Sequence, residues 1–337
     1  MSTSLVPVKG PTDALEETNA VLSLPPLRLL RLSVTDLCNF RCCYCMPRNG
    51  VPKIKHDEVL PLESLSRLVS WLVSHVGIRR VRLTGGEPLV RPAIEHLIAD
   101  LSQLEAIQEI SMTTNGSTLS RRAWALKAAG LNRVNISLDS LDEARFAEIT
   151  RGGTLQSTLA GIKAADEAGL TPIKLNTVLR NSTWKTDVPR LLDYAANTGL
   201  EIRFIELMRM GTEQSWCESE FISVDDVCAG LGAEVLSAEK QPCGPARNTL
   251  VNWHGTLLRV GWIAPRSHPF CNRCERLRMD ARGQIRRCLM DSKTHDLRSV
   301  LITNNDQTAR QELQTYLEGK LPPLAMESHV PMNQIGG

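Results

Sequence analysis

Three closely spaced cysteines constrain this chain more than any other feature of its sequence. Cys38, Cys42 and Cys45 stand at the spacing C-x3-C-x2-C, directly after an apolar run. A disulfide would use two of these thiols and leave the third, whereas a soft metal centre would use all three. An iron–sulfur cubane usually has four cysteine ligands, so three cysteines would leave one iron open to another ligand. The alternative is a structural zinc site, although such sites favour paired C-x2-C and four ligands.

The composition is that of a globular chain with room for one large domain or two ordinary ones. Its 337 residues are 42% hydrophobic and 23% charged, with a formal net charge of +2. The small net charge argues against nucleic acid as a partner, and no apolar run is long enough to cross a membrane. Residues 1–20 lack the apolar segment of a secretory signal. We therefore expect a cytoplasmic protein, in which ten cysteines indicate metal or redox chemistry rather than disulfides.

Short apolar runs alternate with segments of helical periodicity in the first two thirds of the chain. The runs predict six strands, at residues 27–34, 81–84, 107–113, 133–138, 173–179 and 202–207. Such alternation predicts parallel strands joined by helical crossovers. Six units are too few for a closed eight-unit barrel, which leaves an open sheet or a partial barrel. Gly85, Thr113 and Ser137 fall at or just beyond predicted strand ends, the rim where such folds place active sites.

We divide the chain into three parts. Residues 1–24 have no periodicity and predict a mobile arm, and residues 25–211 carry the alternating pattern. In residues 212–337 the alternation stops, and the sequence predicts β structure over residues 249–263 with a turn at His254-Gly255, and a hairpin through residues 281–283.

A second cysteine set, Cys271, Cys274 and Cys288, has the spacing C-x2-C-x13-C. This spacing is compatible with a zinc site that takes His268 as its fourth ligand. It is equally compatible with a second iron–sulfur cluster that again has an open iron.

Four arginines stand where they could bind an anion. Arg276 and Arg278 alternate on a predicted strand, so both side chains face one way. Guanidinium groups beside a cluster would suit a planar or phosphorylated anion, unless the strand is a solvated basic edge. Arg31 and Arg82 lie on strands that run toward the predicted rim, where an unpaired charge is costly. Either could also be an ordinary surface charge.

The segment Gly85-Gly86-Glu87-Pro88 follows the second predicted strand. Its glycines would let the backbone approach a ligand closely, and Glu87 could accept a hydrogen bond from an ammonium group. An ordinary strand-to-helix turn is the alternative.

Together these motifs resemble the radical S-adenosylmethionine (SAM) enzymes and, among them, the GTP 3′,8-cyclases of molybdenum cofactor biosynthesis. The resemblance runs from about residue 27 to the C-terminus. It rests on residues 35–47, 84–88 and 113–116, the second cysteine set and the terminal Gly336-Gly337. It implies a (β/α)6 partial TIM barrel of the radical SAM type, with a C-terminal extension that carries a second iron–sulfur cluster.

The resemblance also implies a role for each matching residue. The ligands of a SAM-binding [4Fe-4S] cluster would be Cys38, Cys42 and Cys45, and those of a substrate-binding [4Fe-4S] cluster Cys271, Cys274 and Cys288. The SAM site would be lined by Tyr44, Gly86, Ser137 and Met208. The residues that hold GTP would be Arg31, Arg82, Thr113, Lys174, Arg276, Leu277 and Arg278. The residues that act on the reaction itself would be Arg276, Arg278, Gly336 and Gly337.

In the implied reaction, a 5′-deoxyadenosyl radical from SAM removes hydrogen from ribose C3′ of GTP. The C3′ carbon then attacks guanine C8, and reduction yields (8S)-3′,8-cyclo-7,8-dihydroguanosine 5′-triphosphate. The implied partners are an electron donor and the next pathway enzyme, cyclic pyranopterin monophosphate synthase, with a homodimer as an open expectation.

Two other functions are compatible with parts of the pattern. One is a radical SAM enzyme with an auxiliary cluster that acts on a peptide, which would favour an acidic or aromatic groove. Aromatic residues make up only 4% of this chain. The other is a binding module with two zinc ions and no catalytic activity.

Overall fold

A computed structural model describes residues 27–210, 214–232, 234–238, 244–271, 274–302, 306–318, 327–328 and 332–335. The predicted arm at residues 1–24 and the terminal Gly336-Gly337 lie outside the described residues.

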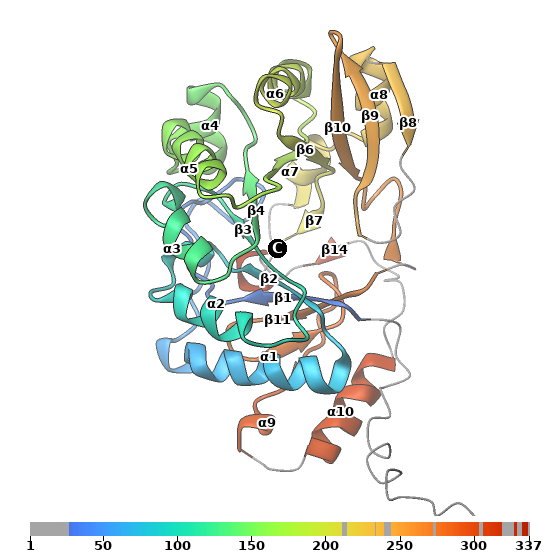
Figure 1. Cartoon of the computed structure of the whole chain (residues 1–337). Coiled ribbons are helices and arrows are strands. Elements are labelled where there is room, and N and C mark those ends of the chain that lie inside the picture. Colours follow the sequence, from blue (N-terminus) through green and yellow to red (C-terminus); the bar gives the residue numbers. More distant parts are fainter. Residues whose placement is uncertain are drawn as a thin grey trace, which may run out of the picture.

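One twelve-stranded sheet organises the described chain (Figure 1). Its central strands pair side by side in chain order, all parallel, as the alternating sequence pattern predicts. These strands are β1 (Leu29–Ser33), β2 (Arg80–Thr84), β3 (Glu109–Thr114), β4 (Arg133–Ser137), β5 (Lys174–Val178) and β6 (Glu201–Ile205).

Strands from the last third of the chain extend this sheet at both sides. At one side, β11 (Arg276–Met279) pairs in parallel with β1, and at the other β10 (Thr256–Ile263) pairs in parallel with β6. The outer strands continue antiparallel: β12 (Gln284–Arg286) and β13 (His295–Asp296) beyond β11, and β9 (Arg247–Trp253) and β8 (Glu234–Ala238) beyond β10. The predicted division at residue 211 therefore falls within one continuous sheet. The sheet remains open, since β13 and β8 are its two ends, and the predicted partial barrel is confirmed.

Helices lie along the outside of the parallel strands (Figure 1). They are α1 (Leu62–Val76), α2 (Ile94–Ser102), α3 (Ala123–Ala128), α4 (Glu143–Thr150), α5 (Leu155–Glu167) and α6 (Trp184–Thr198). Short 3-10 turns occur at η1 (His56–Glu58), η2 (Pro88–Val90) and η3 (Leu119–Arg121). Among the helices that the structure describes, none has the length and apolar character needed to cross a membrane.

Further elements belong to the C-terminal third. They are the helices α7 (Gln214–Ser219), α8 (Val224–Leu231), α9 (Ser299–Ile302), α10 (Asp306–Glu318) and α11 (Met332–Ile335), and the paired strands β7 (Arg209–Met210) and β14 (Glu327–Ser328). The sequence between residues 212 and 249 showed no clear period. The described residues of this segment form α7, α8, β8 and the start of β9. Elements of five to eight residues contain too few turns to display a period.

Helix α1 illustrates how the outer layer is fixed. Leu65, Leu68 and Leu72 recur at intervals of three and four residues, so they share one face, and each is fully buried against the sheet. Burying one such side chain contributes about 1.5–3 kcal/mol. The helix ends at Gly77, whose φ of 84° is the left-handed conformation that glycine adopts without strain.

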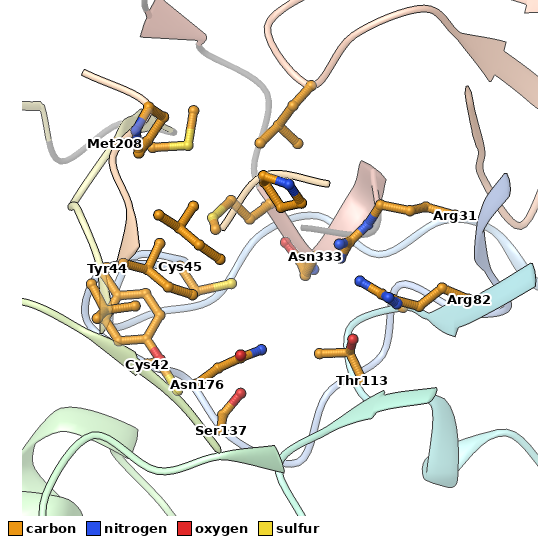
Figure 2. A pocket seen from close by; sticks show the side chains of 18 of the residues that line it. Arg31, Cys42, Tyr44, Cys45, Arg82, Thr113, Ser137, Asn176, Met208 and Asn333 are labelled. Atoms are coloured by element: carbon orange, nitrogen blue, oxygen red, sulfur yellow. The ribbon is translucent and has the colours of Figure 1, made fainter. Parts of the chain in front are cut away.

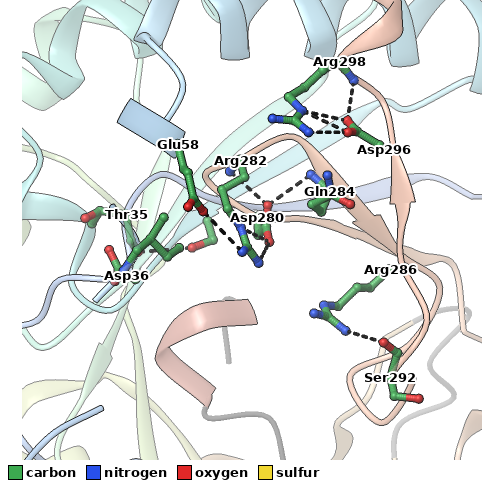
Figure 3. Close-up of polar contacts among 12 residues, drawn as sticks. Thr35, Asp36, Glu58, Asp280, Arg282, Gln284, Arg286, Ser292, Asp296 and Arg298 are labelled. Carbon is green, nitrogen blue, oxygen red and sulfur yellow. Dashed lines mark hydrogen bonds and ion pairs between the residues drawn. The ribbon is translucent and has the colours of Figure 1, made fainter. Parts of the chain in front are cut away.

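A tight turn joins β11 to β12 (Figure 3). Cys288 follows two residues after β12. The buried carboxylate of Asp280 accepts hydrogen bonds from the backbone N–H groups of Arg282, at 2.9 Å, and Gln284, at 3.0 Å. Its second oxygen receives the Arg282 guanidinium at 3.0 Å, and Gly283 supplies a φ of 79°. The antiparallel pairing of β11 with β12 confirms the predicted hairpin through residues 281–283.

Candidate active site

The loop after β1 brings the first cysteine set (Cys38, Cys42 and Cys45) to one wall of a cavity of about 320 Å³. Cys42 and Cys45 are seen from the cavity side in Figure 2. Burial raises the pKa of Cys38 to about 11 and, together with the nearby Cys38 thiol, that of Cys45 to about 12. Three mutually close, poorly solvated thiols favour the neutral form unless a metal supplies compensating positive charge.

Both cysteine sets present sulfur donors to one cavity. Among the described residues, no group of three or more His, Cys, Asp or Glu side chains is placed to hold a single metal ion. All six predicted cluster ligands line the same cavity, and a set of soft sulfur donors is what an iron–sulfur cluster needs.

The glycines after β2 are required because the cysteine loop runs directly over them. A Cβ on Gly86 would lie 2.4 Å from the carbonyl oxygen of Leu37, and one on Gly85 would lie 2.6 Å from that of Thr35. The backbone N–H of Gly86 donates to the Thr35 carbonyl, and that of Glu87 donates to the Leu37 carbonyl, each at 2.8 Å. The glycines therefore leave space for the backbone of the cysteine loop as well as for any ligand. The sequence did not indicate this contact with the loop.

Glu87 ties this turn to the end of β3. Its buried carboxylate accepts hydrogen bonds from the Thr114 hydroxyl at 2.7 Å, the Asn115 N–H at 2.7 Å and the Leu89 N–H at 3.1 Å. Burial raises its pKa to about 7 in spite of these donors. Glu87 also lines the cavity, so it both fixes the wall and faces the space that a ligand would fill.

The four residues predicted to contact SAM come from four separate segments and all line the cavity: Tyr44, Gly86, Ser137 and Met208. The Tyr44 hydroxyl donates to Asp139 at 2.7 Å, and the other oxygen of Asp139 accepts from the Val178 N–H at 2.8 Å. Tyr44 is thereby fixed between the first cysteine set and the ends of β4 and β5.

The second cysteine set (Cys271, Cys274 and Cys288) lines the same cavity. His268, the proposed fourth ligand of a zinc site, does not line it; its Nε2 lies 2.6 Å from an Asp225 carboxylate oxygen. His268 is therefore not placed to be the fourth ligand of a zinc site at these cysteines.

Arginines on three adjacent parallel strands form what we call the arginine row: Arg82 on β2, Arg31 on β1 and Arg278 on β11. The register places Arg31 opposite both Arg82 and Arg278. Arg276 lies two residues earlier on β11, so it shares the face of Arg278. All four line the cavity, and Figure 2 shows Arg31 and Arg82 extending into it beside Thr113.

Burial and neighbouring arginines lower the pKa values of the arginine row. Burial lowers the pKa of Arg82 to about 9, and burial together with neighbouring Arg276 lowers that of Arg278 to about 9. Burial, followed by repulsion from Arg278 and Arg82, also lowers the pKa of Arg31. Several buried like charges on one face are the electrostatic complement of a polyanion.

Two residues predicted to hold GTP lie away from the cavity lining. Lys174 is the first residue of β5, and its ammonium pairs with Glu201, the first residue of β6, at 2.7 Å. The next residue on that face, Asn176, lines the cavity instead. The side chain of Leu277 points to the opposite face of β11 and is fully buried in the core. Contacts of these two residues with GTP stay predictions.

Several lining residues were missed by the sequence reasoning, namely Asp139, Asn176, Arg203 and Asn333. Arg203 is an inward position of β6, and burial lowers its pKa to about 10. The alternation of β5 and β6 could have indicated Asn176 and Arg203, because both follow a polar residue at spacing two. No local signal identifies Asn333, which arrives from the last helix.

Comparison with known proteins gives consistent matches over the two parts of the chain. Residues 32–194 match the family model of the Radical SAM superfamily, and residues 200–324 match that of Molybdenum Cofactor Synthesis C. The "GTP 3′,8-cyclase" of Pelotomaculum thermopropionicum is 42% identical over 277 residues, which cover 82% of this chain and 85% of that protein. The "GTP 3′,8-cyclase 2" of Mycobacterium tuberculosis (strain ATCC 25618 / H37Rv) is 44% identical over 285 residues, covering 83% and 79%.

Among solved structures, the chain resembles Streptococcus suis SuiB bound to its precursor peptide SuiA. The TM-score is 0.61 at 15% sequence identity, and the match covers 82% of this chain and 63% of that one. At this identity the likeness supports the fold alone.

Proposed function

Because this chain belongs to the GTP 3′,8-cyclases of the radical SAM superfamily, we propose that its cavity holds SAM and GTP side by side between two iron–sulfur clusters. The protein is an enzyme, a radical SAM GTP cyclase of molybdenum cofactor biosynthesis. A peptide as substrate is not favoured, since the relatives at 42–44% identity are GTP cyclases.

One observation carries the assignment of the site. The arginine row lines the same cavity as both cysteine sets. GTP carries its charge on the triphosphate, and guanidinium groups bind phosphate oxygens with two parallel hydrogen bonds. We infer that the arginine row and Arg276 hold the triphosphate, while Thr113 offers a hydroxyl beside it.

The position of both cysteine sets on this cavity supports their assignment as cluster ligands. The first cysteine set would hold a [4Fe-4S] cluster that binds SAM, and the second would hold a [4Fe-4S] cluster that faces the substrate. When bound, these groups and SAM supply a radical able to remove hydrogen from carbon and the electrons that the reaction needs.

The chain's own residues position the reactants. Tyr44, fixed by Asp139, and Ser137 would contact SAM at the ends of β4 and β5. Anchoring the triphosphate at the arginine row would set how far the ribose reaches toward that site. Holding two reactants at near-attack distance accounts for a large share of catalysis, and a misplacement of about 1 Å can cost about 100-fold. The expected product is (8S)-3′,8-cyclo-7,8-dihydroguanosine 5′-triphosphate.

We also propose an electron donor and cyclic pyranopterin monophosphate synthase as partners, and a homodimer that sedimentation analysis can test. The cytoplasm is the expected compartment, because thiols reserved for clusters need a reducing environment.

Anaerobic incubation with SAM, a reductant and GTP tests the proposal directly. We expect 5′-deoxyadenosine and the cyclised nucleotide, from a brown protein that contains about eight irons. A colourless, zinc-loaded protein that stays inactive after anaerobic iron–sulfur reconstitution would overturn it.

A further inference from the structure

The loop that carries the first cysteine set has a second, outward side. Cys42 and Cys45 line the cavity, whereas Cys43, which stands between them, lines a separate hollow on the other side of the loop. Two backbone hydrogen bonds hold the loop there: Arg41 N–H to Thr150 at 2.8 Å, and Cys43 N–H to Ile149 at 2.9 Å. One layer of backbone therefore separates this hollow from the predicted cluster ligands.

Arginines surround the outer hollow. It is continuous with a neighbouring one, since Arg48, Glu148 and Arg151 line both. We call the combined feature the basic groove and define it by its cations, Arg41, Arg48, Arg151 and Arg180. Its carboxylates are Glu148 and Glu220, and the latter accepts hydrogen bonds from the backbone N–H and the hydroxyl of Ser182.

Several arginines elsewhere in the described chain pair with a carboxylate. Arg80, Arg122 and Arg133, for example, each form an ion pair with a glutamate. Within the described part of the chain, no ion pair is formed by any of the four arginines of the basic groove.

Arg180 is the informative member of the four. It is only 6% exposed, yet it lines the hollow, and the one hydrogen bond that its guanidinium donates to a described residue is a long one, 3.4 Å to the Thr183 hydroxyl. Burial raises the pKa of the Asp139 carboxyl and Arg180 acts to lower it, so that carboxylate offsets part of the cost of burying the guanidinium, although the two residues form no ion pair. An anionic partner would offset the rest of that cost.

We infer that the basic groove is the docking surface for an acidic, low-potential one-electron carrier protein. This inference rests on the proposed function, in which SAM cleavage needs one electron at the first cluster. The carrier's centre would lose one electron and the cluster would gain it, with no proton or other group transferred. Electron transfer falls steeply with distance, and the groove is the outer face of the loop that supplies the ligands. Positive charge at this position would steer a negatively charged carrier to it.

Arg48 is the residue best suited to a test. It is exposed and lines both hollows, and its side chain makes no hydrogen bond to any other residue that the structure describes. Replacing it therefore removes charge without breaking a described contact. Arg48→Glu reverses the charge, and Arg48→Lys keeps it. Arg67→Glu is the matched control, because Arg67 is equally exposed but lies on α1, outside the groove.

The experiment uses the cluster-loaded enzyme and a reduced plant-type ferredoxin as the probe. Two quantities are measured across a series of NaCl concentrations: the Kd of the ferredoxin for the enzyme, and 5′-deoxyadenosine release driven either by ferredoxin or by dithionite. Electrostatic steering changes association rates about 10- to 1000-fold, so reversing one of four charges should weaken ferredoxin binding about tenfold at low salt. The loss should shrink as salt screens the charges.

We expect Arg48→Glu to lower ferredoxin-driven turnover in parallel with binding and to leave dithionite-driven turnover within about twofold of wild type. Arg48→Lys and Arg67→Glu should bind ferredoxin as the wild type does. An unchanged Kd for Arg48→Glu would overturn the inference, as would an equal loss with dithionite. Stronger competition by inorganic phosphate than by chloride at equal ionic strength would instead identify a small-anion site. Absence of deoxyadenosine with dithionite in the wild type would count against the proposed function, and the binding measurement would still decide this inference.

Discussion

The side-chain amide of Asn333 donates a hydrogen bond to the backbone carbonyl of Asp36 at 3.0 Å, joining residues 297 positions apart in the chain. Asp36 lies two residues before Cys38, the first of the predicted cluster ligands. The backbone N–H of Asn333 also hydrogen-bonds the Cys45 thiol. The last described helix, α11, is thus hydrogen-bonded to the loop that carries the first cysteine set (Figure 2).

This contact leads to a prediction about the C-terminal end. Asn333→Ala removes one buried hydrogen bond, worth about 0.5–1.5 kcal/mol, and should loosen the segment that precedes Gly336-Gly337. We expect both clusters and SAM binding to remain, while cyclised product per deoxyadenosine falls. Deleting Gly336 and Gly337 should lower the product more strongly. Iron content, deoxyadenosine and product are measured side by side, and wild-type product formation by the deletion variant would mean that the tail has no catalytic part.

The two cysteine sets should fail in different ways. Cys42→Ser should abolish SAM cleavage, because two thiolates do not hold the first cluster, whereas Cys274→Ser should retain much of the cleavage and lose cyclisation. Each variant serves as the control for the other when deoxyadenosine and cyclised product are both measured. Full-rate cyclisation by Cys274→Ser would make the second set structural, and wild-type cleavage by Cys42→Ser would refute the assignment of the first.

The arginine row should recognise the triphosphate. A charge-assisted contact to phosphate contributes about 1.5–3 kcal/mol, so Arg278→Ala or Arg276→Ala should raise the Kd for GTP about tenfold or more. Guanosine, which lacks phosphates, should lose little affinity. Arg80→Ala is the matched control, since Arg80 lies on the same strand as Arg82 but pairs with Glu275 and does not line the cavity. Equal losses for GTP and guanosine would show that these arginines act on something other than phosphate.

Gly86 should tolerate no side chain. A methyl group there would lie 2.4 Å from the Leu37 carbonyl oxygen, so Gly86→Ala must displace the cysteine loop and should lower both iron content and thermal stability. Gly152→Ala is the control, because its methyl group would lie 3.4 Å from the nearest atom, the Asn39 carbonyl oxygen. Normal iron content in Gly86→Ala would mean that the loop has room to shift.

Features set by local spacing could be predicted from the sequence. Arginines two apart on a strand must share a face, and Cys38, Cys42 and Cys45 lie on one short loop. The sequence did not indicate that Cys43, on the same loop, lines the other side. The alternation of strands and helices determined the order of six parallel strands, since crossovers of that length leave few other arrangements. The hairpin through residues 281–283 could likewise be predicted from local sequence.

Only the tertiary structure decided which distant segments meet. Arg31 and Arg278 become neighbours because β11 returns to pair with β1, and nothing in either strand's own pattern specifies that partner. Lys174 shares a face with Asn176 but starts its strand, so the register places it beside Glu201 and below the cavity. The contact of Asn333 with the cysteine loop, and the arginines gathered behind that loop, depend in the same way on long-range packing. Local sequence sets periodicity and turns, whereas the energy of non-local pairs depends on surfaces that exist only once the chain is folded.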